Sequence, residues 1–253
     1  TLPRSYFVNL IIRMAVPSRR IKYLCGLVLG FFLLQCFFRV LFLCFVSEIS
    51  LTFDVDLLKA IFIGFRFDLR VSILIAMTAL PFLIIPKYNA TNYSSIRTLL
   101  QLWFTIALLG VLILYTVDAG HYFYLGKRLD ASIIRFGSNI LISGKMLWQS
   151  YSILTISAVI TLLLVVGAWS HKHCLAPFLY SPKKSVKLRV QALYLIVLCA
   201  LLLFSIMGRW SLVPLRWNHA FFSGDSELAA IALNPIVWIY DTASFETNWP
   251  RKD

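Results

Sequence analysis

Residues 24–46 read LCGLVLGFFLLQCFFRVLFLCFV, an apolar run that contains a single charge, Arg39. A helix needs roughly 20 residues of this kind to cross a hydrocarbon core about 30 Å thick. Spanning segments must be helical because lipid cannot satisfy exposed backbone groups. The run therefore predicts a transmembrane helix. The whole chain fits this environment, since 60% of its 253 residues are hydrophobic and its mean hydropathy is +0.81.

Five apolar runs have the composition of a span, and they predict an all-α, polytopic membrane protein with short interfacial and juxtamembrane helices. Their approximate bounds are 24–46, 67–85, 99–118, 152–170 and 190–207. The second run can extend back toward Leu57, and Pro81 is expected to kink it. Residues 1–23 then form a basic N-terminal segment, residues 24–207 the five-helix domain, and residues 208–253 an extracytoplasmic linker.

The distribution of charge predicts which loops face the cytoplasm. Residues 1–23 and the loops after the second and fourth runs hold half of the 24 basic residues and none of the 11 acidic ones. The positive-inside rule places these segments in the cytoplasm, and an odd number of spans then places the C-terminus outside. The net charge of +13 follows from topology and from attraction to anionic headgroups, so it requires no nucleic acid.

Several charges lie within or beside the outer parts of the predicted spans. Arg66 and Arg70 are four residues apart and share a helix face, whereas Asp68 points roughly the other way. Arg39 is a candidate partner for Asp68 or Asp118. One interpretation is structural ion pairs or side chains that reach to the interface. The other is a basic pocket that holds a lipid phosphate through bidentate arginine contacts.

The segment DAGHYFYLGKRLDASIIRFGSNI, residues 118–140, follows the third run. Its Leu129, Ile133 and Ile134 predict a short amphipathic helix in the interface, and its basic residues are placed for phosphates or for nearby acids. The ion-pair candidates are Asp68 and Asp118. The candidates for binding lipid or phosphate are Arg39, Arg66, Arg70, Lys127 and Arg128.

No pattern in the chain assigns a catalytic residue or a metal ligand. G-x-S-x-G, H-E-x-x-H and P-loop motifs are absent, and the acidic residues are scattered. His171 and His173 form an H-x-H in a basic loop without a carboxylate, whereas a closed zinc site needs four ligands. Inverted repeats are also absent, which disfavours a secondary transporter.

Residues 217–238 read WNHAFFSGDSELAAIALNPIVW and follow the last apolar run. Ser223 or Asp225 can cap a helix there. Asn234 can end that helix and cap a second one, which begins at Pro235 and continues to about residue 244. We expect this segment to pack on the outer membrane interface beside the GKRLD motif.

Four features together resemble the membrane domain of the lipoteichoic acid synthase family, within the alkaline phosphatase/sulfatase superfamily. They are the five spans, RFDLR at 66–70, the D…YF…GKRLD segment at 118–130, and PLRWNHAFFSGDSELAAIALNP at 214–235. The resemblance covers nearly the whole chain. It implies a transferase in the cytoplasmic membrane of a bacterium. Such an enzyme moves phosphoglycerol or phosphoethanolamine from a phospholipid to a glycan or lipid acceptor.

The family's catalytic centre lies in a large soluble domain after the membrane domain. There a metal-bound Thr or Ser attacks the lipid phosphodiester, so Mn or Mg is expected in that domain. Only ETNWPRKD follows Phe245 here, and we expect the chain to be a piece of a longer protein. Its expected partners are membrane phospholipids and its own catalytic domain. The alternatives are a stand-alone lipid-binding or regulatory membrane protein and, ranked last, a transporter.

Overall fold

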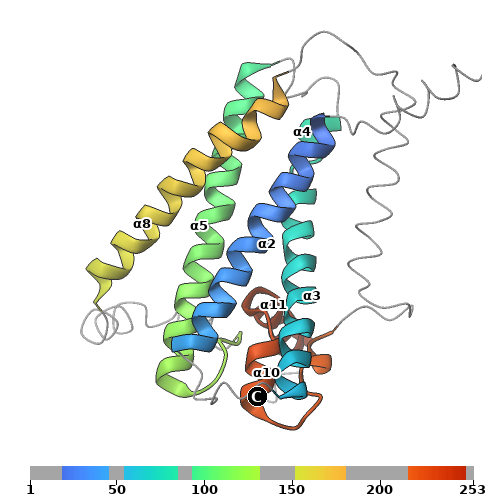
Figure 1. Ribbon diagram of the computed structural model, residues 1–253, viewed down its shortest axis with the longest axis vertical. Helices are drawn as coiled ribbons and strands as arrows, with labels where there is room; N and C mark the ends of the chain where they lie inside the picture. The colour runs from blue at the N-terminus through green and yellow to red at the C-terminus, as the bar shows by residue number, and fades with distance from the viewer. Residues whose placement is uncertain (1–18, 46–53, 85–92, 132–151, 181–215, 249–253) are drawn as a thin grey trace, which may run out of the picture.

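The computed structural model describes residues 19–45, 54–84, 93–131, 152–180 and 216–248. Every regular element within these ranges is a helix. The four long helices are α2 (Arg19–Phe45), α3 (Val55–Met77), α5 (Ser94–Leu125) and α8 (Ile153–Ser170). Figure 1 shows α2 beside α3 and α5 beside α8, with successive helices running in opposite directions.

Three segments in the described part of the chain are long and apolar enough to cross a membrane: Ile21–Cys44, Ser94–Leu125 and Ile153–Leu179. Their length and composition indicate a membrane protein. They correspond to the first, third and fourth predicted spans. The predicted fifth span, 190–207, and most of the predicted interfacial helix with Ile133 and Ile134 lie outside the described residues.

The second predicted span differs from its prediction. Helix α3 begins at Val55, where Asp54 Oδ1 accepts a hydrogen bond from the Val55 N–H at 2.6 Å. It carries five charged residues, so it is not among the segments apolar enough to cross. It ends at Met77, and a short helix α4 (Pro81–Ile84) follows a turn. Pro81 therefore begins a new helix instead of kinking a continuous one, because it has no N–H for an i→i−4 bond.

Helix α5 continues beyond the predicted end at Asp118 and stops at Gly126. The glycine has φ of 67°, a left-handed conformation that L side chains rarely adopt, and its N–H donates to Tyr122 O at 2.8 Å. Helix α8 matches its predicted bounds. It continues as a π-helix, η3 (His171–Leu175), and a 3₁₀-helix, η4 (Ala176–Leu179).

Two apolar clusters fill the bundle. The first joins α2 to α5 around Leu27, Phe31 and Leu112, toward the N-terminal end of α2. The second lies toward the C-terminal end of α2 and joins Phe42 to Phe67 of α3. This second cluster includes residues from the end of the chain, so the C-terminal segment belongs to the folded core.

The C-terminal segment forms η5 (Trp217–Ala220), α10 (Ser226–Ala232) and α11 (Pro235–Asn248). Asp225 caps α10, since its Oδ1 accepts from Glu227 N at 2.8 Å. Asn234 Oδ1 accepts from the backbone N–H of Ile236, the second residue of α11, at 2.9 Å. The predicted pair of helices, with Asn234 as the second cap, is confirmed, although α11 runs to Asn248 and not to about residue 244.

The corner between these helices, residues 229–235, is buried throughout. Its Asn234 contacts Gln35 of α2 and Tyr115 of α5. Each of these residues lies ten positions before the end of its helix, which is about 15 Å at 1.5 Å per residue. The corner is thus inserted between α2, α3 and α5 (Figure 1). The apolar and polar side chains of the corner are enclosed by helices, an insertion that the sequence did not predict.

The expected contact with the GKRLD motif is confirmed. Arg128 Nε donates to Ala230 O at 2.9 Å. Ala131 N, immediately after the motif, donates to Thr242 Oγ1 of α11 at 3.0 Å. The end of α5 and the C-terminal helices are therefore connected through backbone groups as well as through apolar packing.

Candidate functional site

A bidentate ion pair joins α2 to α3 inside the bundle. Arg39 Nε donates to Asp68 Oδ2 at 2.8 Å, and Nη2 donates to Oδ1 at 2.7 Å. The two side chains are 3% and 0% exposed. Planar guanidinium and carboxylate groups are suited to this paired geometry, and burial of both charges requires it.

The remaining N–H groups of Arg39 donate hydrogen bonds to backbone carbonyls. Nη1 donates to Ile231 O and, at 3.5 Å, to Leu233 O, while Nη2 also donates to Gly64 O at 3.2 Å. All five guanidinium N–H groups of Arg39 are thereby engaged. The carbonyls of Ile231 and Leu233 lie at the C-terminal end of α10, where intrahelical partners run out and a cation is favourable.

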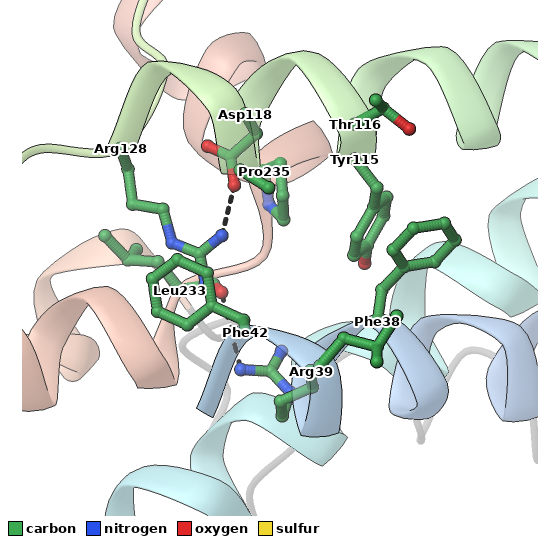
Figure 2. A pocket seen from close by; sticks show the side chains of 11 residues that line it. Phe38, Arg39, Phe42, Tyr115, Thr116, Asp118, Arg128, Leu233 and Pro235 are labelled. Atoms are coloured by element: carbon green, nitrogen blue, oxygen red, sulfur yellow. Dashed lines mark hydrogen bonds and ion pairs between the residues drawn. The ribbon is translucent and has the colours of Figure 1, made fainter. Parts of the chain in front are cut away.

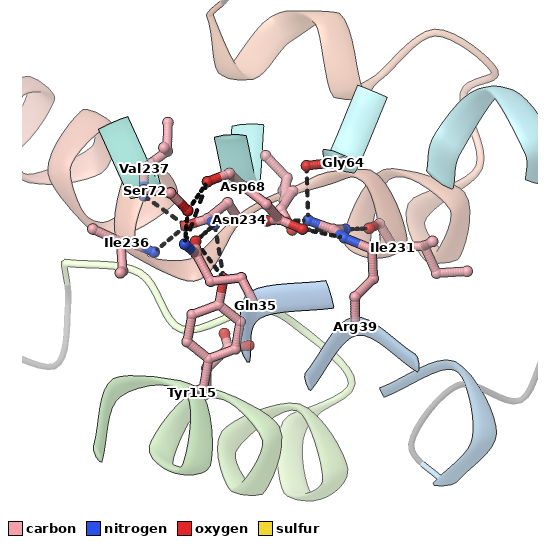
Figure 3. Close-up of polar contacts among 12 residues, drawn as sticks. Gln35, Arg39, Gly64, Asp68, Ser72, Tyr115, Ile231, Asn234, Ile236 and Val237 are labelled. Carbon is pink, nitrogen blue, oxygen red and sulfur yellow. Dashed lines mark hydrogen bonds and ion pairs between the residues drawn. The ribbon is translucent and has the colours of Figure 1, made fainter. Parts of the chain in front are cut away.

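A hydrogen-bond network of mostly uncharged side chains continues from this pair (Figure 3). Asn234 Nδ2 lies 2.8 Å from three acceptors, Gln35 Oε1, Asp68 Oδ1 and the Tyr115 hydroxyl. Gln35 Nε2 donates to Ser72 Oγ at 2.7 Å. These five side chains are buried, so each polar group needs a protein partner. Asn234 therefore links the C-terminal corner to α2, α3 and α5 at one point.

A second ion pair lies between Asp118, near the end of α5, and Arg128. Asp118 Oδ1 also accepts from Leu129 N at 2.9 Å. The Arg128 guanidinium carbon lies 3.7 Å from the centre of the Phe42 ring, a cation–π contact with α2. Together with its bond to the carbonyl of Ala230, Arg128 joins α5, α2 and α10.

A cavity of about 260 Å³ lies beside the two ion pairs, between α2 and α5. Leu233 and Pro235 of the corner contribute to its wall. Figure 2 shows the guanidinium of Arg128 between Asp118 and Phe42, with Arg39 below. The remaining lining is mostly apolar. The cavity therefore combines two arginines, two apolar helix faces and the C-terminal corner.

The structure brings together two of the five candidate residues, Arg39 and Arg128. Arg66 lies over Phe62 at 5.9 Å from the ring centre and does not line the cavity. Lys127 is 61% exposed at its side chain and lies 4.0 Å from Asp130. The ion-pair candidates Asp68 and Asp118 both lie in buried ion pairs.

Arg70 lies apart from the cavity, in the electrostatic environment of Asp241 on α11. Burial raises the pKa of the Asp241 carboxyl above its usual value, while Arg70, the backbone of Trp217 and Arg216 act in the opposite direction. Arg66 and Arg70 thus have different surroundings although they share a helix face.

His171 is a packing residue at the opposite end of the bundle. One ring nitrogen, Nε2, lies 2.9 Å from the Tyr23 hydroxyl, and the other is hydrogen-bonded to Gln101 Oε1. The ring stacks on Phe104 at 4.3 Å. Hydrogen bonds at the two ring nitrogens therefore connect η3 to α2 and to α5. The described residues contain no group of three or more His, Cys, Asp or Glu side chains that could hold a metal ion.

Four residues of the network, Gln35, Ser72, Tyr115 and Asn234, were not among the candidate site residues, although Asn234 was predicted as a helix cap. For Gln35 and Ser72 a signal exists in the spacing. Gln35 stands four residues before Arg39, and Ser72 stands four residues after Asp68. Polar residues at this spacing share a helix face, and a polar face on a helix that is otherwise apolar indicates a buried partner.

No family model, curated protein or solved structure matches the chain. The resemblance to the lipoteichoic acid synthase family therefore stays a prediction from the quoted motifs.

Proposed function

We propose that the chain is the membrane domain of a lipid-headgroup transferase of the lipoteichoic acid synthase type. It anchors a catalytic domain to the bacterial cytoplasmic membrane and helps to position the phospholipid at the outer leaflet. The observation that carries the proposal is the fixation of the C-terminal corner inside the bundle by Arg39, Arg128 and Asn234.

A rigid connection suits an enzyme whose substrate is part of the membrane. The scissile phosphodiester of a phospholipid stays at a fixed height, so the catalytic centre must be held at that height. Correct orientation of the reacting groups can supply a large part of the lowering of a reaction barrier. A flexible linker would need no buried contacts with the bundle, whereas the corner is bonded to α2, α3 and α5 through buried side chains.

The orientation also supports the proposal. If the basic segments face the cytoplasm, the corner, both ion pairs and the cavity lie in the outer half of the bundle. A phospholipid of the outer leaflet then has access to the side of the bundle where the C-terminal helices emerge. We assign no catalytic residue to this chain, and the nucleophile and its Mn or Mg belong to the catalytic domain.

The test has a genetic and a chemical part. We expect the coding sequence to continue past Asp253 into a sulfatase-like domain. We also expect deletion of the gene to abolish transfer of radiolabelled glycerol phosphate or ethanolamine phosphate from membrane phospholipid to an envelope acceptor, and plasmid-borne full-length protein to restore it. A reading frame that stops at Asp253, or unchanged transfer of both groups after deletion, would contradict the proposal.

The second candidate is a stand-alone lipid-binding or regulatory membrane protein. The cavity between α2 and α5 favours it, because lipid binding there needs no catalytic domain. Phospholipid binding without any effect of gene deletion on headgroup transfer would select this function.

A further inference from the structure

We propose that the cavity between α2 and α5 holds the phosphodiester of one phospholipid, with Nη2 of Arg128 as its main hydrogen-bond donor. This inference names the lipid site of the proposed function and rests on it for the choice of a membrane lipid as ligand. It distinguishes Arg128 from Arg39, although both arginines line the cavity and both are paired with an aspartate.

The donors of the two arginines differ. Arg39 engages all five of its N–H groups with protein oxygens. Arg128 uses Nε for Ala230 O and Nη1 for Asp118, and its Nη2 has no hydrogen-bond partner in the part of the chain that the structure describes. The side chain of Arg128 is only 6% exposed. The two unused N–H groups of Nη2, on a side chain that lines the cavity, can therefore donate to an anionic oxygen of a ligand.

The charges around the cavity favour a lipid over a free anion. Arg39 with Asp68 and Arg128 with Asp118 form two neutral pairs, so the site has no net charge to attract phosphate from solution. Affinity must then come from hydrogen bonding and from apolar contact. The wall supplies this contact through Phe38, Leu41 and Phe42 of α2.

The size of the cavity indicates which part of the lipid it accommodates. Its volume of about 260 Å³ is below the range of roughly 300–1,000 Å³ for clefts that enclose a drug-sized ligand. It can hold the phosphodiester and the adjoining glycerol. The acyl chains then lie outside it, along exposed apolar side chains of α2 and α5: Phe37, Val40, Ile113 and Val117.

Two substitutions test the site by independent routes. Arg128→Lys retains a cation for Asp118 but has a single nitrogen, so it removes Nη2 together with the Nε bond to Ala230 O. Ala119→Phe fills the cavity from α5 and changes neither ion pair. The matched control is Ile106→Phe, which adds a ring at a position of α5 that is 61% exposed. Binding of dioleoyl phosphatidylglycerol to the purified chain in detergent is measured by native mass spectrometry, with thermal unfolding of each variant alongside.

We expect both cavity variants to bind this lipid about tenfold more weakly than wild type, as for loss of one charge-assisted hydrogen bond, and Ile106→Phe to bind normally. Dioleoylglycerol, which lacks the phosphate, should also bind about tenfold more weakly. Millimolar sn-glycerol 3-phosphate should not displace the lipid. Wild-type affinity in a folded Ala119→Phe protein overturns the site, as does equal binding of dioleoylglycerol. Displacement by glycerol phosphate assigns the site to a soluble phosphate and overturns the lipid.

These outcomes are separate from those of the proposed function, because the binding experiment involves no transfer. A chain that binds lipid in this cavity, from a bacterium in which gene deletion leaves transfer unchanged, contradicts the proposed function alone. A transfer-competent protein whose lipid binding is insensitive to Ala119→Phe contradicts this inference alone.

Discussion

Arg39 donates all five guanidinium N–H groups to protein oxygens, whereas Arg128, among the residues that the structure describes, donates only from Nε and Nη1. Both arginines pair with a buried aspartate, but in this part of the chain only Arg128 retains N–H groups that can donate to a ligand. A buried ion pair contributes little net stability when intact, but removal of one partner leaves an uncompensated charge that costs about 3–5 kcal/mol. The two ion pairs act mainly by fixing which segments of the helices contact one another.

Gly64 gives a sharp test of the Arg39 contacts. A Cβ at this position would overlap the Arg39 guanidinium, whereas a Cβ at Gly30 would meet nothing within 4 Å. Alanine in a helix is otherwise favoured over glycine by about 0.5–1 kcal/mol. We expect Gly64→Ala to destabilise the protein by about 2 kcal/mol through displacement of Arg39. Gly30→Ala should be neutral or stabilising. Chemical unfolding in detergent measures both, and equal effects would refute the Arg39 arrangement.

Asn234 has two roles that one pair of substitutions separates. Its Oδ1 caps α11, and its Nδ2 lies 2.8 Å from Asp68 Oδ1. Aspartate caps a helix as well as asparagine does, but Asn234→Asp places a second carboxylate against Asp68. We expect a loss of about 3 kcal/mol for Asn234→Asp and about 2 kcal/mol for Asn234→Ala.

The control for Asn234 is the exposed cap of α10. Asp225→Asn should change stability by less than about 0.5 kcal/mol, because its side chain caps the helix without a buried partner. The free energy of unfolding is again the measurement. If Asn234→Asp were as stable as wild type, capping would be the whole role of Asn234, and the buried network would not discriminate charge.

At the scale of elements, α10 depends on its surroundings. A helix of seven residues is not stable alone in water. Its residues Ala229, Ile231 and Ala232 are almost completely buried, and its C-terminal carbonyls are bound by Arg39. The small alanine side chains permit close approach to α2 and α3. The corner therefore owes its conformation to the bundle, and it is expected to unfold together with it.

Cysteine accessibility tests the inserted corner. In a variant whose five native cysteines are replaced by alanine, Ala232→Cys should resist a water-soluble maleimide, since Ala232 is 0% exposed. Tyr240→Cys on α11 should react readily, since Tyr240 is 74% exposed. Mass spectrometry of the detergent-solubilised protein gives the labelled fraction. Rapid labelling at residue 232 would mean that the corner lies outside the bundle.

At the scale of the whole molecule, the polar groups divide between two ends. Arg39, Asn234 and Arg128 connect helices at the end where the C-terminal segment enters, and His171 connects helices at the other end. Helix α8 packs against α5 but has no buried residue of its own. Buried polar contacts therefore join α2, α3 and α5, which are the helices that hold the corner.

Labelling from one side of the membrane tests the predicted orientation of the bundle. We expect Lys127→Cys, in the cysteine-free background, to react with a membrane-impermeant maleimide added to intact spheroplasts. Lys172→Cys should react only after permeabilisation, because the positive-inside rule predicts that the basic loops face the cytoplasm. Both positions are exposed, so burial does not bias the comparison. Labelling of residue 172 from outside would reverse the orientation and would move the cavity to the inner leaflet.

Local features of the chain were predictable because they depend on neighbours in sequence. The extent of α8, the cap at Asp225 and the cap at Asn234 follow from apolar length and from short-range hydrogen bonding. Pro81 predicts a kink in the helix, but not that the helix ends at Met77 and a new one begins at Pro81. The difference depends on how the turn between them packs. The candidate arginines were predictable individually, because a charged residue within or beside an apolar segment is rare. Which of them line one cavity was not.

The sequence by itself determined an all-helical chain of membrane composition, the places where several helices start and stop, and the outer location expected for its charges. Only the tertiary structure decided that Arg39 pairs with Asp68, that Arg128 pairs with Asp118, and that Asn234 lies about 15 Å inside the bundle. The physical reason is distance along the chain. Periodicity and capping are set by residues three or four apart, whereas a contact across 199 residues, such as Gln35 with Asn234, depends on how complete helices pack.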